Sequence, residues 1–368
     1  MAKQDRKRFA VVLAAGEGTR MKSSRPKPLI RICGKPMAAH ILEAISGAGI
    51  DDVVAVVGFK SEDVKSTLMR YCPEGMRLNF VEQKNQRGTG DALASALTAL
   101  PDPLKYSESE SPVVVVVPGD TPLVTNMTIS ELVALHIASL SATTVSYTEM
   151  KNPSGYGRVI FGKSNAISKI VEDRDATDAE RDSKRINASF YAMNLDVLAP
   201  ALRRLSPKNT QGEYYLTDVI EILAKAGYKI SGFEIDDSTE AFGVNDRDQL
   251  ASVEKRMREL INARFMRQGV NLVDPSGIYI DSTVEIGQDT TIWPGSFLIG
   301  QTVIGQGSEI GPEVRISNSI IDDNARVLRS DLEGCHVGAD AFVGPYAVLK
   351  AGSKVPPEGV TGSFVVLE

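Results

Sequence analysis

The chain of 368 residues has few of the side chains that build disulfide frameworks and metal centres, with only three cysteines and three histidines. Cys33, Cys72 and Cys335 are odd in number and lack the C-x-x-C spacing of zinc and redox motifs. Such free thiols are typical of a reducing compartment, so we expect a cytoplasmic protein. The pair Cys335 and His336 supplies two potential ligands, too few for a structural zinc site.

Long apolar runs and excess positive charge are also missing. The longest continuous aliphatic run, Val113 to Val117, is far shorter than the roughly 20 residues that a membrane-spanning helix needs. The formal net charge of −6 argues against broad binding of nucleic acid or of an anionic membrane surface. A basic stretch before Phe9 superficially resembles a secretion signal, but the apolar segment after it breaks at Gly16 and fits the first strand of a domain.

Most of the chain alternates between strand-like and helix-like patterns. Apolar segments at 9–14, 53–58, 78–82 and 113–117 alternate with helical patterns near 36–48, 61–70, 89–100 and 128–139. This alternation predicts an α/β fold with a Rossmann-like, doubly wound and mostly parallel sheet. Pro118, Gly119 and Asp120 follow the fourth strand-like segment, and ligands of open α/β sheets bind at this end of the strands.

The pattern changes in the last third of the chain. Residues 246–268 are charged and amphipathic, which predicts one long helix, and we interpret it as a linker arm. Beyond Asp274 apolar residues recur every six positions, at Ile280, Ile286, Ile292, Leu298, Ile304, Ile310 and Ile316. This hexapeptide repeat predicts a short left-handed parallel β-helix of roughly four coils; the alternative, an irregular β-sandwich, does not account for the regular spacing.

The register of the repeat slips near Ile321 and Leu332 and then resumes. We therefore divide the chain into a first domain at 1–245, a linker helix at 246–273 and a β-helix at 274–368. A length of 368 residues suits two domains better than one.

The stretch from Phe9 to Leu29, FAVVLAAGEGTRMKSSRPKPL, runs from an apparent strand into a glycine loop. Gly16 and Gly18 let the backbone approach an anion, while Arg20 and Lys27 place two cations near a transferred phosphoryl group. The loop lacks the GK[ST] of a Walker motif and the third glycine of a dinucleotide fingerprint. An ordinary strand-to-helix turn explains the glycines but not the two cations.

Further motifs follow this loop in order: EQ at 82–83, QRGTGDA at 86–92, PGDTPL at 118–123, GYGR at 155–158, IVED at 170–173, RIN at 185–187, GEYYLTD at 212–218 and GVN at 243–245. With LAAGEGTRM, the following PK, the long helix and the hexapeptide tail, the chain resembles the bifunctional N-acetylglucosamine-1-phosphate uridylyltransferase/glucosamine-1-phosphate acetyltransferase family over nearly its whole length. The resemblance implies synthesis of UDP-N-acetylglucosamine and pyrophosphate from UTP and N-acetylglucosamine 1-phosphate, with Mg²⁺ as cofactor. It also implies a homotrimer assembled through the β-helix.

The resemblance assigns roles to individual residues. Asp120 and Asn245 are implied as Mg²⁺ ligands, a role that suits their oxygen atoms, and Arg20 and Lys27 as catalytic cations facing the α-phosphate and the departing pyrophosphate. The implied nucleotide-binding residues are Leu13, Ala14, Ala15, Gly16, Gly18, Gln83, Gly88 and Thr89. The implied sugar-binding residues are Gly157, Glu172, Asn187, Tyr215 and Thr217. Taken singly, Asp120 and Asn245 are equally typical of turns.

The residue types are consistent with this chemistry. A sugar phosphate oxygen is already ionised near neutral pH, so it attacks the α-phosphorus without a general base or a covalent enzyme intermediate. The enzyme then has to position the reactants and neutralise charge. A side-chain amide such as that of Gln83 offers both a donor and an acceptor to the edge of uracil.

The chain also departs from the family pattern. Pro118 stands where the family usually has Tyr, and Ala188 where it usually has Thr, so another sugar 1-phosphate, such as glucose 1-phosphate, or another nucleotide stays open. The acetyltransferase site of the family includes a catalytic His in a KAGH-like segment. Here LKAG at 349–352 is followed by no histidine, so we expect no acetyltransferase activity and no acetyl-CoA site.

A noncatalytic scaffold that oligomerises through the hexapeptide repeat is the alternative from another class. Loss of the cations or of the metal-ligand candidates would have favoured it. Arg20, Lys27, Asp120 and Asn245 are all present, so we rank the enzyme first.

Overall fold

The computed structural model describes residues 6–162 and 166–368. It contains two compact units: the first extends to Leu250 but leaves out Arg31–Lys35, which belongs to the second together with Ala251–Glu368. The division falls within helix α8 (Arg247–Arg267). The boundaries drawn from the sequence at 245 and 273 stay a prediction, and they did not anticipate that a short segment near Cys33 joins the second unit.

The first unit is built on a nine-stranded sheet. Its main path runs through β11 (Ile230–Glu234), β7 (Thr143–Glu149), β10 (Arg185–Asn194), β6 (Val113–Pro118), β1 (Arg8–Ala14), β4 (Asp52–Val57) and β5 (Arg77–Glu82). Off this path, β8 (Arg158–Phe161) pairs with β10 and with β9 (Ile167–Val171). Strand β10 is antiparallel to both β6 and β7, whereas β6, β1, β4 and β5 are parallel.

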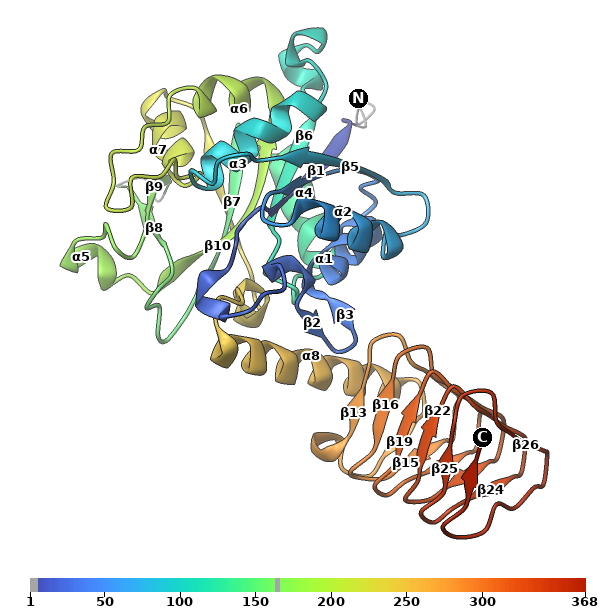
Figure 1. Cartoon of the computed structure of the whole chain (residues 1–368). Helices are drawn as coiled ribbons and strands as arrows, with labels where there is room; N and C mark the ends of the chain where they lie inside the picture. The colour runs from blue at the N-terminus through green and yellow to red at the C-terminus, as the bar shows by residue number, and fades with distance from the viewer. Residues whose placement is uncertain (1–5, 163–165) are drawn as a thin grey trace. The chain divides into compact units, whose positions relative to one another are not determined.

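Helices cover both faces of this sheet (Figure 1). They are α1 (Met37–Gly47), α2 (Ser61–Arg70), α3 (Thr89–Ala96), α4 (Asn126–Ser139), α5 (Asp178–Arg181), α6 (Leu195–Leu202) and α7 (Asp218–Lys225). Alternate residues of one strand enter different cores: Val115 packs with α1 and α4 on one face, while Val114 and Val116 pack with α3, α6 and α7 on the other. Burial on both faces explains why β6 is a continuous valine run, and it confirms the doubly wound α/β fold.

Residues 271–367 of the second unit form three parallel sheets that stack successive turns of the chain (Figure 1). The first contains β12 (Asn271–Leu272), β15 (Thr291–Ile292), β18 (Glu309–Ile310), β21 (Arg326–Val327) and β24 (Phe342–Val343). The second contains β13 (Tyr279–Ile280), β16 (Phe297–Ile299), β19 (Arg315–Ser317), β22 (Asp331–Glu333), β25 (Val348–Leu349) and β27 (Val366–Leu367). The third contains β14 (Glu285–Ile286), β17 (Val303–Ile304), β20 (Ile320–Ile321), β23 (His336–Val337) and β26 (Lys354–Val355).

These sheets confirm the left-handed parallel β-helix expected from the hexapeptide repeat. The repeated apolar residues point inward; Ile292, Leu298 and Ile310, for example, are fully buried. The estimate of roughly four coils was too low, because each face carries five or six strands. The slip in the repeat is real: Glu285 pairs with Val303 eighteen residues later, but Arg315 pairs with Asp331 sixteen residues later.

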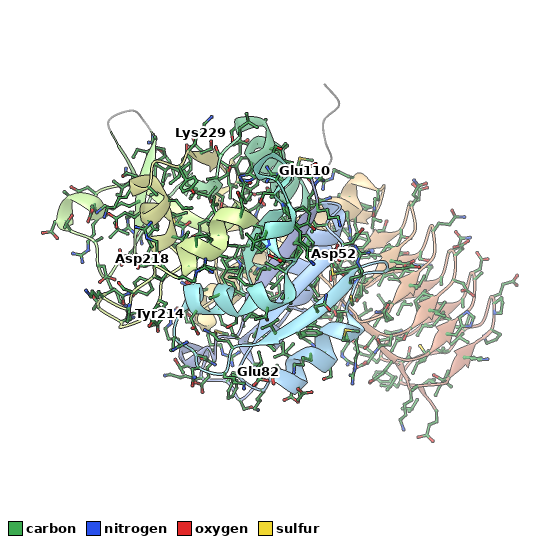
Figure 2. All side chains as sticks on the ribbon, turned by 90° about the horizontal axis from the view of Figure 1, so that it is seen from above. Asp52, Glu82, Glu110, Tyr214, Asp218 and Lys229 are labelled. Atoms are coloured by element: carbon green, nitrogen blue, oxygen red, sulfur yellow. The ribbon has the colours of Figure 1, made fainter. Side chains whose placement is uncertain are left out.

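No helix in residues 6–162 and 166–368 has the length and apolarity needed to cross a membrane. Charged side chains at the edges of the first unit, including Glu82, Glu110 and Lys229, are exposed to solvent (Figure 2). The site described next lies within the first unit alone.

Candidate active site

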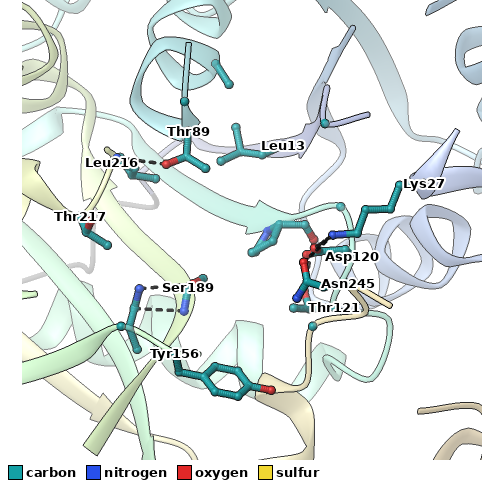
Figure 3. Close-up of a pocket in the computed structure, with 18 of the residues that line it drawn as sticks. Leu13, Lys27, Thr89, Asp120, Thr121, Tyr156, Ser189, Leu216, Thr217 and Asn245 are labelled. Atoms are coloured by element: carbon teal, nitrogen blue, oxygen red, sulfur yellow. Dashed lines mark hydrogen bonds and ion pairs between the residues drawn. The ribbon is translucent and has the colours of Figure 1, made fainter. Parts of the chain in front are cut away.

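A cavity of about 570 Å³ opens at the carboxyl ends of the central parallel strands of the first unit (Figure 3). Its floor includes Leu13 and Ala14 from β1 and Pro118 from β6. The cavity brings together all the residues predicted for the site except Gly18 and Tyr215. The predicted residues that line it are Leu13, Ala14, Ala15, Gly16, Arg20, Lys27, Gln83, Gly88, Thr89, Asp120, Gly157, Glu172, Asn187, Thr217 and Asn245.

The two predicted residues outside the cavity wall have other surroundings. Gly18 has a φ of +69°, and a Cβ there would lie 2.8 Å from Cβ of Lys27, so glycine lets the lysine stem pass close to the loop. Tyr215 is 8% exposed and lies near Glu172, Asp175 and Glu213; burial first, and these carboxylates second, raise the pKa of its phenol to about 12. Their assignment to substrate binding stays a prediction.

One end of the cavity concentrates charge. The ammonium of Lys27 in the short 3-10 helix η2 (Lys27–Leu29) pairs with Oδ2 of Asp120 and donates to Oδ1 of Asn245 at 2.9 Å (Figure 3). The turns that carry the two oxygen donors are tied together, since the amide of Val244 donates to the carbonyl of Asp120 at 2.9 Å. A backbone N–H of Asn245 is held by Gln249 at 2.7 Å. Residues far apart in sequence thus place two oxygens around one cation.

The donor set at this end fits Mg²⁺. A carboxylate and a side-chain carbonyl are the hard oxygen ligands that Mg²⁺ prefers, and the lysine ammonium already shows that both can face one positive charge. The described part of the chain has no group of three or more His, Cys, Asp and Glu side chains that could hold a metal ion. Two protein ligands therefore suit a metal that takes most of its coordination from phosphate oxygens and water.

The loop after β1 supplies the remaining cation. Arg20 lies in the 3-10 helix η1 (Thr19–Met21), is exposed and lines the cavity. The backbone before it is fixed from both sides: the amide of Gly119 donates to the carbonyl of Leu13 at 2.8 Å, and the side chain of Gln86 donates to the carbonyl of Ala15 at 2.9 Å. The backbone before Arg20 is thus anchored, while Arg20 itself is exposed at the cavity, which suits a group that binds phosphate.

The neighbouring wall is formed by the segment that enters α3. Gln83 is 5% exposed, and its Nε2 donates to the carbonyl of Gly88 at 3.1 Å and to Oδ2 of Asp91 at 2.8 Å. Both amide hydrogens are therefore engaged within the protein, and Oε1 is the atom left for a ligand. Oγ1 of Thr89 accepts from the amide of Leu216 at 3.1 Å, which ties α3 to the 212–218 segment (Figure 3).

Glu172 occupies the opposite wall. Its Oε1 accepts from the hydroxyl of Thr217 at 3.0 Å, and a Cβ on Gly157 would lie 3.6 Å from its Oε2. Burial raises the pKa of this carboxyl, and Asp218, Asp175 and Asp173 add smaller effects in the same direction. The hydrogen bond from Thr217 partly offsets them. The carboxyl is placed to accept a hydrogen bond from a hydroxyl group of a ligand.

Several cavity residues were not predicted. Tyr156 belongs to the GYGR motif, from which only Gly157 was predicted as a site residue, and it lines the cavity (Figure 3). Burial first, and the charge of Asp120 second, raise the pKa of its phenol, so it stays protonated near neutral pH. Gln86 and Ser189 also line the cavity. Gln86 opens the QRGTGDA motif, which was a signal in the sequence, but only Gly88 and Thr89 were selected from that motif. Ser189 lies outside every recognised motif.

The two departures from the family pattern both lie at the cavity wall. Pro118 ends β6, and Ala188 lies in β10 next to Asn187. Neither side chain offers a hydrogen-bonding group.

Comparison with known proteins gives a consistent result. A family model described as nucleotidyl transferase matches residues 9–242. The bifunctional protein GlmU of Geobacillus sp. (strain WCH70) is 40% identical over 359 residues, which are 98% of this chain and 75% of that protein. The bifunctional protein GlmU of Halalkalibacterium halodurans is 37% identical over 358 residues, 97% of this chain and 76% of that protein. That of Mycobacterium marinum is 40% identical over 356 residues, 96% and 71% of the two chains.

Proposed function

Since the chain belongs to the nucleotidyl transferase family, among relatives of the bifunctional GlmU proteins, we propose that it is a Mg²⁺-dependent uridylyltransferase acting on a sugar 1-phosphate. The favoured reaction joins UTP and N-acetylglucosamine 1-phosphate into UDP-N-acetylglucosamine and releases pyrophosphate. One observation carries the proposal: Lys27, Asp120 and Asn245 meet at one end of a single cavity whose walls also present Gln83 and Glu172.

The chemistry requires little covalent participation of the protein. An oxygen of the sugar phosphate forms a bond to the α-phosphorus of the nucleotide while the bond from that phosphorus to the bridging oxygen of the β-phosphate breaks. The attacking oxygen is already ionised, so no side chain has to take a proton. Lys27 and Arg20 neutralise charge on the α-phosphate and the leaving pyrophosphate. When bound, Mg²⁺ supplies further neutralisation of the phosphate charge, with Asp120 and Asn245 as its protein ligands.

The hydrogen bonds of Gln83 favour a uracil base. Because its Nε2 is engaged by Gly88 and Asp91, the side chain presents an acceptor, Oε1, to the cavity. In the orientation that we propose, N3 of the base faces Oε1: uracil donates its N3 hydrogen there, whereas N3 of cytosine is itself an acceptor and would oppose Oε1. A mismatched buried pair of this kind costs about 1–3 kcal/mol, which is a strong preference for UTP over CTP.

The sugar is the less constrained substrate. Glu172 suits a sugar hydroxyl, but Pro118 and Ala188 remove side-chain groups that the family pattern would place at the cavity wall. A nucleotidyltransferase for another sugar 1-phosphate, such as glucose 1-phosphate, is therefore the second candidate. A noncatalytic scaffold ranks last, because the cations and oxygen ligands converge in one cavity.

The test is release of pyrophosphate in the presence of Mg²⁺ from a matrix of four nucleoside triphosphates against N-acetylglucosamine, glucose and galactose 1-phosphates. We expect turnover with UTP and N-acetylglucosamine 1-phosphate. Asp120→Ala should abolish it while the circular dichroism spectrum is unchanged. Asp178→Ala, which removes an exposed carboxylate on α5, is the matched control. Absence of turnover with every pair would refute the enzyme assignment.

We also propose that the β-helix assembles the chain into a trimer. Val303 and Ile320 are neighbours on one sheet and are 40% and 49% exposed, while Tyr279 and Phe297 stack at 4.6 Å between ring centroids on another. Exposed apolar side chains on a regular face favour contact with further copies. Analytical ultracentrifugation of the full chain and of Ile320→Lys tests this, and an unchanged monomeric mass in both would contradict it.

The absence of acetyltransferase activity stays a prediction for this chain of 368 residues. Its last histidine, His336, is exposed and interacts with Oδ2 of Asp322 at 2.8 Å. Incubation with acetyl-CoA and glucosamine 1-phosphate, followed by detection of free thiol, measures the activity directly. Thiol release above the level without enzyme would overturn this prediction.

A further inference from the structure

Strand β10 is interrupted where it passes the cavity. Its pairing with β7 shifts between Asn187 and Tyr191, and its pairing with β6 reaches no further than Tyr191 and Val116. Within the bulge, Ser189 has a φ of +64°, the left-handed region that non-glycine residues rarely occupy. Bulges re-aim side chains next to active sites, and here Asn187, Ser189 and Tyr191 all line the cavity.

The interruption accommodates Pro118 on the neighbouring strand β6. The amide of Gly119 donates toward β1, to the carbonyl of Leu13, at 2.8 Å. Since successive amides of a strand point to opposite sides, the amide that Pro118 lacks would have pointed toward β10. No ladder bond is lost, because β10 is no longer paired with β6 at this level, although it still pairs with β7.

The amide group of Asn187 is fully engaged by its neighbours. Its Oδ1 accepts from the backbone amide of Ser189 at 3.1 Å. Its Nδ2 donates to Oγ of Ser189 at 3.2 Å and to the hydroxyl oxygen of Tyr191 at 2.7 Å. Both hydrogens of Nδ2 are therefore donated to groups of the protein. Asn187 was predicted to bind the sugar, but its donors do not face a ligand in this arrangement.

Two hydroxyl hydrogens remain in this cluster. Each hydroxyl oxygen accepts from Asn187, and at most one hydrogen can lie between the two oxygens of Ser189 and Tyr191. At least one hydroxyl hydrogen must then find its acceptor elsewhere. Tyr191 is 2% exposed, whereas Ser189 is partly exposed at the cavity wall, so Ser189 is the group that can direct a hydrogen into the cavity.

We propose that Ser189 is a specificity-determining residue whose hydroxyl donates a hydrogen bond to an oxygen acceptor on the sugar of the substrate. The inference rests on the proposed function, since it takes the ligand of this wall to be a sugar phosphate. The acceptor is either a sugar hydroxyl or the carbonyl of an N-acyl group. Because Oγ accepts from Asn187, its own hydrogen is polarised and becomes the better donor.

The test is binding of three ligands by calorimetry to the full chain with Mg²⁺: UDP, UDP-glucose and UDP-N-acetylglucosamine. In Ser189→Ala, we expect UDP-sugar affinity to fall about five- to tenfold while the affinity for UDP is unchanged. Loss with both sugars identifies a hydroxyl acceptor, and loss with the N-acetyl sugar alone identifies the acyl carbonyl. Ser66→Ala, on the exposed face of α2, is the matched control.

Ser189→Gly separates the hydroxyl from the backbone. Glycine relieves the left-handed conformation, so Tm should rise. It also opens a path for the freed Asn187 hydrogen to reach the sugar, so affinity should lie above that of the alanine variant. Unchanged UDP-sugar binding in Ser189→Ala, or an equal loss for UDP, overturns the inference. Failure of the wild type to bind any UDP-sugar would instead refute the proposed function.

Discussion

Replacement of Lys27 by Met should separate metal binding from catalysis. The ammonium of Lys27 occupies the space between Asp120 and Asn245, the two groups proposed to bind Mg²⁺. The side chains of Lys27 and Asp120 are 13% and 24% exposed, so solvent screens their interaction only in part. A divalent cation that binds without nucleotide must displace this ammonium. We therefore expect the lysine to compete with the metal before substrate binds and to contact phosphate afterwards.

The free energy needed to displace the lysine is estimated from its interaction with Asp120. Two opposite unit charges about 4 Å apart interact by about 4 kcal/mol at an effective dielectric constant of 20. Solvent exposure and the cost of removing water from the two groups reduce the net value to roughly 1–2 kcal/mol. In Lys27→Met, the affinity of the nucleotide-free enzyme for a divalent cation should therefore rise by about five- to thirtyfold. The turnover number should fall by about 10²- to 10³-fold, because a cation facing the transition state is lost.

Electron paramagnetic resonance of Mn²⁺ measures the free ion directly and needs no turnover. Lys22→Met, which removes an exposed lysine from the same loop, controls for the change of net charge. Asp120→Asn should weaken Mn²⁺ binding and so show that the assay reports this site. If Lys27→Met binds Mn²⁺ no more tightly than wild type while Asp120→Asn loses binding, Lys27 does not compete with the metal.

Three further predictions concern Glu172, Gly157 and Arg158. Because the pKa of Glu172 is raised above its ordinary 4.5, the native state holds this proton more strongly than the unfolded state does. The free energy of unfolding should therefore fall as pH rises above 4.5, and the difference in Tm between Glu172→Gln and wild type should grow over the same pH range, in favour of the variant. In Gly157→Ala, the new Cβ would lie 3.3 Å from Cγ2 of Ile170 and 3.6 Å from Cβ of Asn187, so KM for the sugar 1-phosphate should rise about tenfold while KM for UTP is unchanged. The side chain of Arg158 is 3% exposed and pairs with Asp173 at 3.0 Å. Arg158→Lys should therefore lower the free energy of unfolding, measured by urea titration, by about 2 kcal/mol. A loss below about 0.5 kcal/mol would show that this ion pair contributes little to stability.

The parts of the fold that could be predicted are those whose buried positions are occupied by apolar residues. The short valine run of β6 is typical of a strand because valine is β-branched, and the sixfold repeat is typical of a parallel β-helix. Strand β7 escaped prediction because Thr143, Thr144 and Ser146 are fully buried, with the hydroxyl of Ser146 donating to the carbonyl of Phe190 at 2.7 Å. The antiparallel insertion of β10 between β6 and β7 depends on pairing between distant segments, which local patterns do not encode.

The motifs identified which residues reach the cavity, but residue type did not determine which atoms remain available to a ligand. Gln83 was predicted as both donor and acceptor, yet its hydrogens are engaged and only an acceptor remains. Asn187 likewise donates both hydrogens of its side-chain amide to Ser189 and Tyr191. Substrate preference at this site therefore depends on the hydrogen-bonding capacity left after the protein has satisfied its own groups. A substitution at Ser189, outside every motif, then changes the contact that the motif residue Asn187 was expected to make.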